Sequence, residues 1–305
     1  FLLSSGALAA TPLARVFAQA QTAAPAQPPA APPVTAFTDV RRNVGIFTGR
    51  GGTIGWLIDK DAVAVVDSQY PDTAKICLDG VKQKSGGRVI DILFNTHHHA
   101  DHTLGNPVFR ADSKKIVAQA GVPALQRTVA AATPNSAAPV VADETFDRTW
   151  SHSIGGESVT AVFNGPAHTG ADAAIRFERA NVVHMGDLLF LDRHPRVDRA
   201  AGASIQNWIK VLETLERDMS ADTICIAGHT KDGQAPTSDR KALLRFRDYF
   251  DAVLTVTRKA IAQGQTKEAL AATAALPGFE NYQGGGALTL AGVLGVAYDE
   301  LTSKS

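Results

Sequence analysis

Apolar stretches of strand length alternate with amphipathic stretches of helix length along most of this chain. Two helix-length stretches have clear starts: Pro71 opens 71–84, and Ser204 is a suitable N-cap for 204–218, whose apolar residues recur on one face. The sequence after about Ser238 also favours helix. The pattern therefore predicts an α/β protein with two sheets. The strand-like stretches cover residues 52–58, 61–69, 88–97, 114–119, 157–166, 172–190 and 222–229.

Side chains that bind metals follow the apolar parts of several predicted strands. His97, His168, Asp187 and His229 each come within a few residues of such a strand. Strands that end at one edge of a sheet bring residues from distant parts of the sequence onto one rigid scaffold. We therefore expect these four residues to meet at a single site.

The N-terminal segment is predicted to be a leader and a linker. Residues 1–20 are apolar and small, are too short to span a bilayer, and contain a signal-cleavage pattern at Ala18-Gln19-Ala20. Residues 21–36 carry five prolines, which is typical of an extended linker. We expect export to the bacterial periplasm, a mature form without membrane attachment, and one folded domain over 37–305.

Charge and cysteine content narrow the function classes. Lys plus Arg and Asp plus Glu both total 30, so the formal net charge is zero, and no basic run points to nucleic acid. The two cysteines, Cys77 and Cys225, are too few and too far apart for a disulfide framework, and we expect both to be buried. A small-molecule substrate is the expected partner, and oligomeric state is left open.

The segment FNTHHHADHTLGN, residues 94–106, contains four of the nine histidines in the chain. His97 and His99 are two apart, so in an extended turn their rings point to the same side, and Asp101 and His102 follow directly. Imidazole and carboxylate groups are usual zinc ligands, and a set without cysteine is typical of a catalytic site with an open position. The segment therefore predicts a catalytic metal site.

The same residues carry a family resemblance. THHHADH, from Thr96 to His102, resembles the H-x-H-x-D-H signature of the metallo-β-lactamase-fold hydrolase superfamily. Four further motifs, one before it and three after it, occur in the order expected for the family. These are VAVVDS with Asp67, GPAHTGAD with His168, HMGDLLF with Asp187 and IAGHT with His229. The resemblance covers roughly residues 40–232. It implies an αββα sandwich of two mixed β-sheets flanked by helices, with the site at one edge of the sheets.

The resemblance also implies a dinuclear metal site. One metal would be held by His97, His99 and His168, the other by Asp101, His102 and His229, with Asp187 bridging the two. His98 would point away, and Asp67 would orient the loop, with Thr96 and Thr169 as further candidates for that role. Two Zn ions are the expected cofactors, with Mn or Fe as alternatives. His152 and His194 are expected in turns, and His184 on a strand.

The implied activity is hydrolysis. Metals that share a bridging hydroxide would direct it at a carbonyl carbon, with Asp101 orienting the nucleophile as a catalytic residue. An amide or ester, including a β-lactam or lactone, is the favoured substrate class. Asp187 stands where β-lactamases of this fold usually carry Cys or Ser, so β-lactam hydrolysis is left open. A glyoxalase II-like thioester hydrolase is the alternative, and an iron-dependent oxidoreductase or a non-catalytic metal-binding module are the other classes. The substrate pocket is expected in loops at 49–53, 123–139 and 194–203.

Overall fold

The computed structural model describes residues 33–303, and its first strand begins at Ala36. The leader expected over 1–20 and most of the linker expected over 21–36 lie outside the described residues. No helix in the described part of the chain is both long and apolar enough to cross a bilayer. The first strand begins one residue before Phe37, the expected start of the domain.

A seven-stranded mixed sheet forms the first half of the fold. Its strands lie in sequence order, with antiparallel pairs from β1 to β4 and parallel pairs from β4 to β7. Parallel strands end at the same edge, so β4 and β5 deliver the residues that follow them to neighbouring positions. The strands are β1 (Ala36–Arg41), β2 (Val44–Thr48), β3 (Ile54–Ile58), β4 (Val63–Val66), β5 (Ile90–Asn95), β6 (Ser113–Gln119) and β7 (Glu144–Phe146).

A six-stranded mixed sheet forms the second half, in the order β15-β13-β11-β10-β9-β8, and β12 pairs with β14 beside it. The pairs β11–β13 and β12–β14 are parallel. Residues that follow β11 and β13 therefore also meet at one edge. The strands are β8 (Thr149–Ile154), β9 (Glu157–Val162), β10 (Ala174–Phe177), β11 (Val182–His184), β12 (Phe190–Leu191), β13 (Ile224–Ile226), β14 (His229–Thr230) and β15 (Thr237–Asp239).

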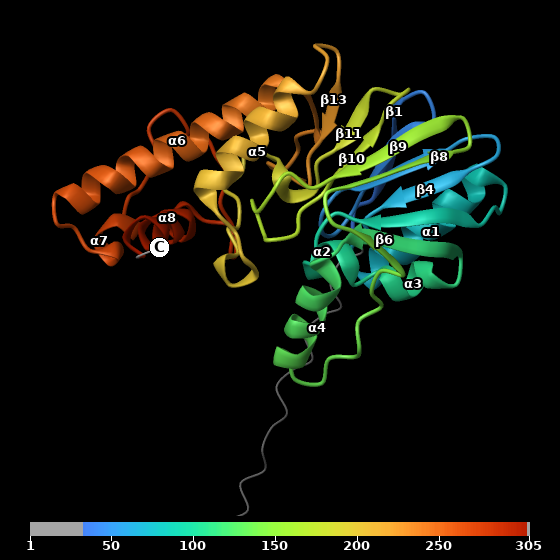
Figure 1. Ribbon diagram of the computed structural model, residues 1–305, viewed down its shortest axis with the longest axis horizontal. Helices are drawn as coiled ribbons and strands as arrows, with labels where there is room; N and C mark the ends of the chain where they lie inside the picture. The colour runs from blue at the N-terminus through green and yellow to red at the C-terminus, as the bar shows by residue number, and fades with distance from the viewer. Residues whose placement is uncertain (1–32, 304–305) are drawn as a thin grey trace, which may run out of the picture. The chain divides into compact units, whose positions relative to one another are not determined.

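Helices cover the outer faces of both sheets (Figure 1). Apolar residues of α1 pack on the first sheet, and those of α5, α6 and α8 on the second. A third apolar cluster, which includes Phe94 and Ile175, fills the space between the sheets. The αββα sandwich is therefore confirmed. The helices are α1 (Pro71–Ser85), α2 (Ala100–Thr103), α3 (Asn106–Arg110), α4 (Val122–Ala132), α5 (Ile205–Arg217), α6 (Lys241–Ala262), α7 (Lys267–Ala271) and α8 (Leu290–Thr302), with 3-10 turns at Gly186–Leu188 and Arg199–Ala201.

The helix boundaries follow local sequence signals. Pro71 occupies the first turn of α1, and Gly86 ends the helix in the left-handed conformation at φ 70°. The Ser204 side chain accepts a hydrogen bond from Asn207 N at the start of α5, as the N-cap prediction requires. The two cysteines are buried, in α1 and β13, and both are free thiols.

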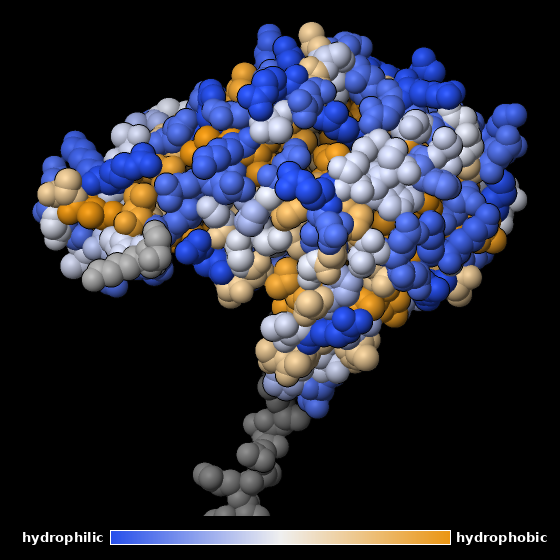
Figure 2. All heavy atoms as spheres, viewed as in Figure 1, coloured by the Kyte–Doolittle hydropathy of each residue, from blue (hydrophilic) through white to orange (hydrophobic). Residues whose placement is uncertain are grey.

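Three local expectations are wrong. The stretch expected as a loop at 123–139 begins inside α4, because Pro123 sits in the first turn of a helix whose exposed residues include Val129. Figure 1 shows α4 projecting away from the two sheets, and Figure 2 shows apolar residues over it. The strand at 222–229 ends at Ile226, and β14 begins separately at His229. His152 lies in β8, with its side chain exposed, and not in a turn.

Candidate metal centre

A buried carboxylate at the end of β4 holds the histidine loop. Asp67 is fully buried and adopts φ 65°, a costly conformation for a residue other than glycine. Its Oδ1 accepts a hydrogen bond from Thr96 N at 2.8 Å. Its Oδ2 accepts from the Thr96 hydroxyl at 2.8 Å and from His102 Nδ1 at 2.7 Å. These bonds hold the loop at both ends and fix the orientation of the His102 ring.

Four buried side chains converge at this site, two from the histidine loop and two from later parts of the chain. One ligand-type atom from each of His97, His99, His168 and Asp187 lies within 4.8 Å of all the others. His99 Nδ1 is 3.1 Å from His97 Nε2 and 2.8 Å from His168 Nε2. Asp187 Oδ2 is 3.2 Å from His168 Nε2. We call these four residues the first group.

Each histidine of the first group has one ring nitrogen that faces the other rings and one that faces away, which we call the inner and the outer nitrogen. Each outer nitrogen has a hydrogen-bond acceptor. His97 Nδ1 lies 3.0 Å from Thr96 Oγ1, whose own proton is donated to Asp67. His99 Nε2 lies 2.8 Å from a carboxylate oxygen of Asp198. His168 Nδ1 lies 2.8 Å from the Arg196 carbonyl oxygen. This network places each proton on the outer nitrogen, so the three inner nitrogens face one another with lone pairs.

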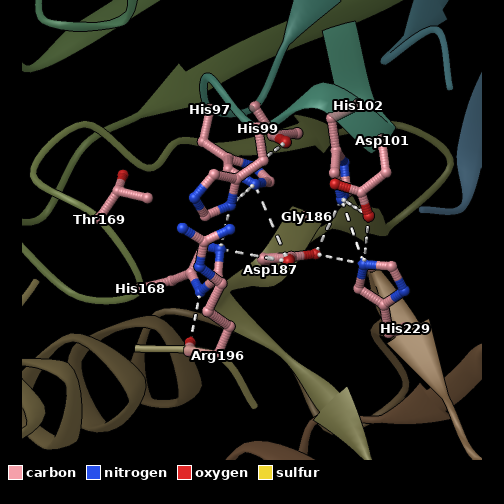
Figure 3. Close-up of polar contacts among 12 residues, drawn as sticks. His97, His99, Asp101, His102, His168, Thr169, Gly186, Asp187, Arg196 and His229 are labelled. Carbon is pink, nitrogen blue, oxygen red and sulfur yellow. Dashed lines mark hydrogen bonds and ion pairs between the residues drawn. The ribbon is translucent and has the colours of Figure 1, made fainter. Parts of the chain in front are cut away.

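A second group, Asp101, His102 and His229, lies beside the first. Its ligand-type atoms are also within 4.8 Å of one another. Asp187 reaches both groups, because its Oδ1 is 3.1 Å from His102 Nε2 and 3.4 Å from His229 Nε2 (Figure 3). His229 Nε2 is also 3.0 Å from Asp101 Oδ2. All seven residues expected at one site are therefore brought together.

Burial and mutual charge shift the pKa values of these groups. Burial and the neighbouring histidines hold the pKa of His97 well below its usual range. Burial also lowers the pKa of His168 to about 3, although Asp187 opposes that shift. Burial opposes a charge on His102, but Asp187, Asp101 and Asp67 outweigh it and raise its pKa. Without another cation, only His102 among these three rings would carry a charge to balance the carboxylates.

The donor set fits two divalent cations. Neutral imidazole nitrogens and carboxylate oxygens are suitable ligands for zinc, and neighbouring lone pairs repel one another unless a cation lies between them. Asp187 Oδ1 is buried and makes no hydrogen bond of good geometry, although two imidazole nitrogens lie within 3.4 Å of it. A buried carboxylate oxygen without a hydrogen bond is costly, and a metal ion would satisfy it. The clusters are therefore compatible with dinuclear metal binding.

The remaining expected residues lie around this centre in different ways. His98 is buried and belongs to neither group, but its Nε2 is 3.9 Å from Asp198 Oδ2, and its ligand-type atom lies within 4.8 Å of those of His99 and Asp198. The Thr169 hydroxyl donates to Asp172 and not to a residue of either group, and burial raises the pKa of Asp172 to about 6. His184 lies in β11, as expected, and its Nε2 is 3.0 Å from the Thr53 carbonyl oxygen.

The sequence did not reveal two residues that contact the first group. Asp198 and Arg196 follow β12 in the segment HPRVD, which carries no recognisable motif. They lie in the expected pocket loop at 194–203, and their partners His99 and His168 are far away in the chain. His194, in the same loop, is buried, and its Nδ1 is 2.8 Å from the Tyr249 hydroxyl.

Comparison with known families identifies the fold that carries this centre. The family model described as the metallo-beta-lactamase superfamily matches residues 48–229, which include both groups. The chain belongs to the metallo-beta-lactamase superfamily. Members of this superfamily are mostly hydrolases. The matched segment runs from the end of β2 to the first residue of β14, so α6 to α8 lie beyond it.

Individual relatives are distant. The chain is similar to metallo-beta-lactamase IND-1 from Chryseobacterium indologenes, with 23% identity over 201 residues, or 65% of this chain and 80% of that protein. A metallo-beta-lactamase from Pontibacter korlensis aligns with a TM-score of 0.59 at 18% identity, covering 72% of this chain and 99% of that one. The sec-alkylsulfatase Pisa1 from Pseudomonas sp. aligns with a TM-score of 0.66 at 15% identity, covering 88% of this chain and 50% of that one. These solved structures share the fold at low identity.

Proposed function

We propose that the protein is a dinuclear metal-dependent hydrolase that cleaves an amide or ester, with β-lactams and lactones as the leading substrate classes. One observation carries the proposal. Three inner imidazole nitrogens converge while their outer nitrogens are held by Thr96, Asp198 and the Arg196 carbonyl. Such outer hydrogen bonds orient metal-binding histidines and raise their basicity. A histidine-rich cluster with only a packing role has no need of this arrangement.

The proposed ligand sets follow the two groups. His97, His99 and His168 would hold the first ion, and Asp101, His102 and His229 would hold the second. Asp187 would be shared by both, because its Oδ2 lies near the first group and its Oδ1 near the second. Zinc is the proposed metal, since all ligands are imidazole or carboxylate, with manganese or iron as alternatives. The proposed setting is the bacterial periplasm, and the proposed partner is a small-molecule substrate.

Two bound ions would activate a water molecule as the nucleophile at neutral pH and would polarise the carbonyl of the substrate. The chain contributes the carboxylate of Asp101 at the solvent side of the centre, where its side chain is 25% exposed against 5% for Asp187. Burial favours the neutral form of Asp101, but His102 and His229 outweigh that effect and hold its pKa below the usual range. Asp101 therefore accepts a hydrogen bond at neutral pH and can orient the attacking water.

Hydrolysis of a chromogenic cephalosporin by zinc-loaded protein, with a chelator-treated control, tests the proposal. We expect two zinc ions per chain and chelator-sensitive turnover. Asp187→Ala should bind at most one ion tightly, and its kcat/KM should fall by more than about 100-fold. This fall exceeds the loss that is typical when a residue that only hydrogen-bonds to a metal ligand is replaced. The exposed Asp147→Ala is the matched control and should retain both metals and activity.

The possible outcomes separate the metal centre from the substrate class. Two bound zinc ions without cephalosporin turnover would overturn the β-lactam part and move the test to a lactone and to a thioester, the alternative class. A chain that binds no zinc, manganese or iron would overturn the proposed function. Strong visible absorption with bound iron and oxygen-dependent turnover would instead indicate an oxidoreductase.

A further inference from the structure

A buried histidine that belongs to neither group lies between the two sheets. His184 is the last residue of β11, is fully buried and points toward β3, where a Cβ on Gly55 would lie 2.7 Å from its Cδ2 atom. The missing side chain at residue 55 therefore makes room for the imidazole. A buried polar ring is costly unless its nitrogens are hydrogen-bonded, so the partners of His184 indicate what the ring does.

Both ring nitrogens of His184 have partners. Nδ1 accepts a hydrogen bond from Gly186 N at 3.2 Å, and Nε2 lies 3.0 Å from the Thr53 carbonyl oxygen. Because Nδ1 accepts, the ring proton is on Nε2, which donates to Thr53. Burial lowers the pKa of His184, so the ring stays neutral and Nδ1 remains an acceptor. The ring thus links the turn before Asp187 to the glycine-rich loop between β2 and β3.

These two contacts belong to a closed cycle of four hydrogen bonds. Thr53 N donates to the Gly228 carbonyl oxygen at 2.8 Å, and Gly228 N donates to the Gly186 carbonyl oxygen at 2.8 Å. The remaining two bonds are those from Gly186 N to His184 Nδ1 and from His184 Nε2 to the Thr53 carbonyl oxygen. His184 enters this cycle through its side chain, whereas the other three residues enter it through backbone groups.

Each backbone member of the cycle is next to a residue at the second group. Gly186 precedes Asp187, Gly228 precedes His229, and Thr53 follows Gly52, whose Cα faces the His102 ring. A Cβ on Gly228 would lie 2.1 Å from Asp187 Oδ1, so the cycle packs directly against that carboxylate. Figure 3 shows Gly186 beside Asp187, between the two groups. The cycle therefore connects the backbone on which Asp187 and His229 are carried.

We propose that His184 is a positioning residue for Asp187, and that its bond to Gly186 N holds the turn in which the Asp187 carboxylate can be shared by both groups. Gly186 is buried, so its N–H without the imidazole would lack a partner, and the turn would shift to find one. A shift of this turn would move the carboxylate that follows it. The inference rests on the proposed metal centre but not on the proposed reaction.

Two amide variants separate the two contacts of His184. The side-chain oxygen of Asn takes the place of Nδ1, so His184→Asn can still accept from Gly186 N. The amide nitrogen of Gln takes the place of Nε2, so His184→Gln can still donate to Thr53 but leaves Gly186 N without a partner. Metal-free protein is titrated with zinc by calorimetry. We expect His184→Gln to lower the affinity for at least one zinc ion by about 10- to 100-fold, and His184→Asn to lower it by less than about 3-fold.

The Asp187→Ala background shows whether His184 acts through Asp187. Addition of His184→Gln to Asp187→Ala should change the remaining zinc affinity by less than about 3-fold, because the carboxylate that His184 positions is already absent. A general loosening of the fold would instead lower zinc affinity in both backgrounds. His152→Gln, at an exposed position of β8, is the control and should bind zinc like the wild type.

The outcomes separate this inference from the proposed reaction. Two bound zinc ions without turnover would overturn the reaction alone, because the comparison of zinc affinities needs no substrate. Equal zinc affinity in His184→Gln and the wild type, equal losses in the two amide variants, or the same loss with and without Asp187 would each overturn the inference. A variant that does not fold even with excess zinc would also overturn it, since His184 would then serve the fold and not the centre. A wild type that binds no metal would overturn both.

Discussion

At the residue scale, Asp67 connects the two halves of the candidate centre. One of its oxygens accepts from His102, and the same oxygen accepts from Thr96, whose hydroxyl oxygen in turn faces His97. His102 belongs to the second group and His97 to the first. A single buried carboxylate therefore orients a proposed ligand of each metal, although it belongs to neither group.

Asp67→Asn is expected to weaken both metals. The amide would place a donor against the Thr96 hydroxyl or the Thr96 N–H, and the His102 ring would lose its charged acceptor. Substitution of a residue that hydrogen-bonds to a metal ligand typically lowers metal affinity by about 10- to 100-fold. Zinc content after dialysis against a competing chelator measures this loss. The exposed Asp79→Asn is the control, and equal zinc retention in both variants would contradict the role of Asp67.

His98 and His99 are adjacent but should respond differently to substitution. His99→Ala removes a nitrogen from the first group and should remove one zinc ion from the protein. His98→Ala should keep both ions, because His98 belongs to neither group, and its cost should be a packing loss of about 1–3 kcal/mol in unfolding free energy. Metal analysis and denaturant unfolding measure the two effects. Loss of zinc from His98→Ala alone would reverse the assignment.

At the element scale, the glycine-rich loop between β2 and β3 packs directly on the second group. A Cβ on Gly52 would lie 2.1 Å from His102 Cε1, and Gly52 N donates to the Asp101 carbonyl oxygen. The loop can approach this closely only because residue 52 has no side chain. The glycines of the sequence GRGGT therefore allow the loop to pack against the His102 ring.

Gly52→Ala should displace the His102 ring. We expect a loss of about 1–3 kcal/mol in unfolding free energy, as for other overpacked sites, and weaker binding of the second zinc ion than of the first. Calorimetric titration of metal-free protein with zinc would resolve the two binding steps. Gly233→Ala is a useful comparison, because a Cβ at residue 233 would have no neighbouring atom within 4 Å, although its φ of 79° adds backbone strain. A Gly52→Ala variant with unchanged zinc binding would show that the loop can move away from His102 to make room for the added methyl group.

Helix α5 is held at its start by a residue of α8. Glu300 Oε1 accepts from the Ser204 hydroxyl at 2.8 Å, and Oε2 accepts from Ile205 N at 2.8 Å. The Glu300 carboxylate therefore satisfies a free N–H at the first turn of α5 and lies at the positive end of the helix dipole. This contact joins α8, which lies beyond the family match, to α5, whose apolar residues pack on the second sheet.

Glu300→Gln is expected to lower the unfolding free energy by about 1–2 kcal/mol, because one charged acceptor of a helix N-terminus is lost. Denaturant unfolding at neutral pH measures the change. Glu178→Gln, at an exposed turn, is the control and should be neutral. A Glu300→Gln variant as stable as the wild type would show that Ser204 alone is sufficient to cap α5.

At the scale of the whole molecule, the centre lies where strands of both sheets end. Its residues follow β5, β9, β11 and β13, and Asp67, which orients the histidine loop, follows β4, so the two halves of the sandwich meet at this centre. Bound ions would therefore connect the sheets in the native state and would have no preformed site in the unfolded chain. Metal binding should be linked to global stability.

Removal of the metals should lower the melting temperature. Saturation at about 100 times Kd contributes about 2.7 kcal/mol for each site, and a domain of this size gains roughly 2–4 °C in melting temperature for each kcal/mol. We expect a fall of roughly 5–10 °C for each ion removed by a chelator, measured by scanning calorimetry. His97→Ala combined with Asp187→Ala should respond little to the same chelator. An identical melting temperature with and without zinc would contradict a structural link between the sheets.

Much of the fold and the ligand set was readable in the sequence because the signals are local. The apolar strands, the helix starts at Pro71 and Ser204, and the H-x-H-x-D-H spacing each depend on residues close in the chain. Strands β1, β2, β7, β8 and β15 and helices α2, α3 and α4 were not predicted. β1 and β8 have largely exposed or half-exposed residues, so their apolar pattern is weak, and α4 follows a proline that also suits a loop.

The sequence by itself determined which side chains are available to bind metal and that they follow strands. Only the tertiary structure decided how those side chains are oriented. The bonds from Asp67 to His102, from His99 to Asp198 and from His168 to Arg196 join residues 35, 99 and 28 positions apart. No local pattern specifies such partners, because a buried imidazole accepts any well-placed carboxylate or carbonyl. The packing of two sheets selects which one is near, and so fixes the direction in which each lone pair points.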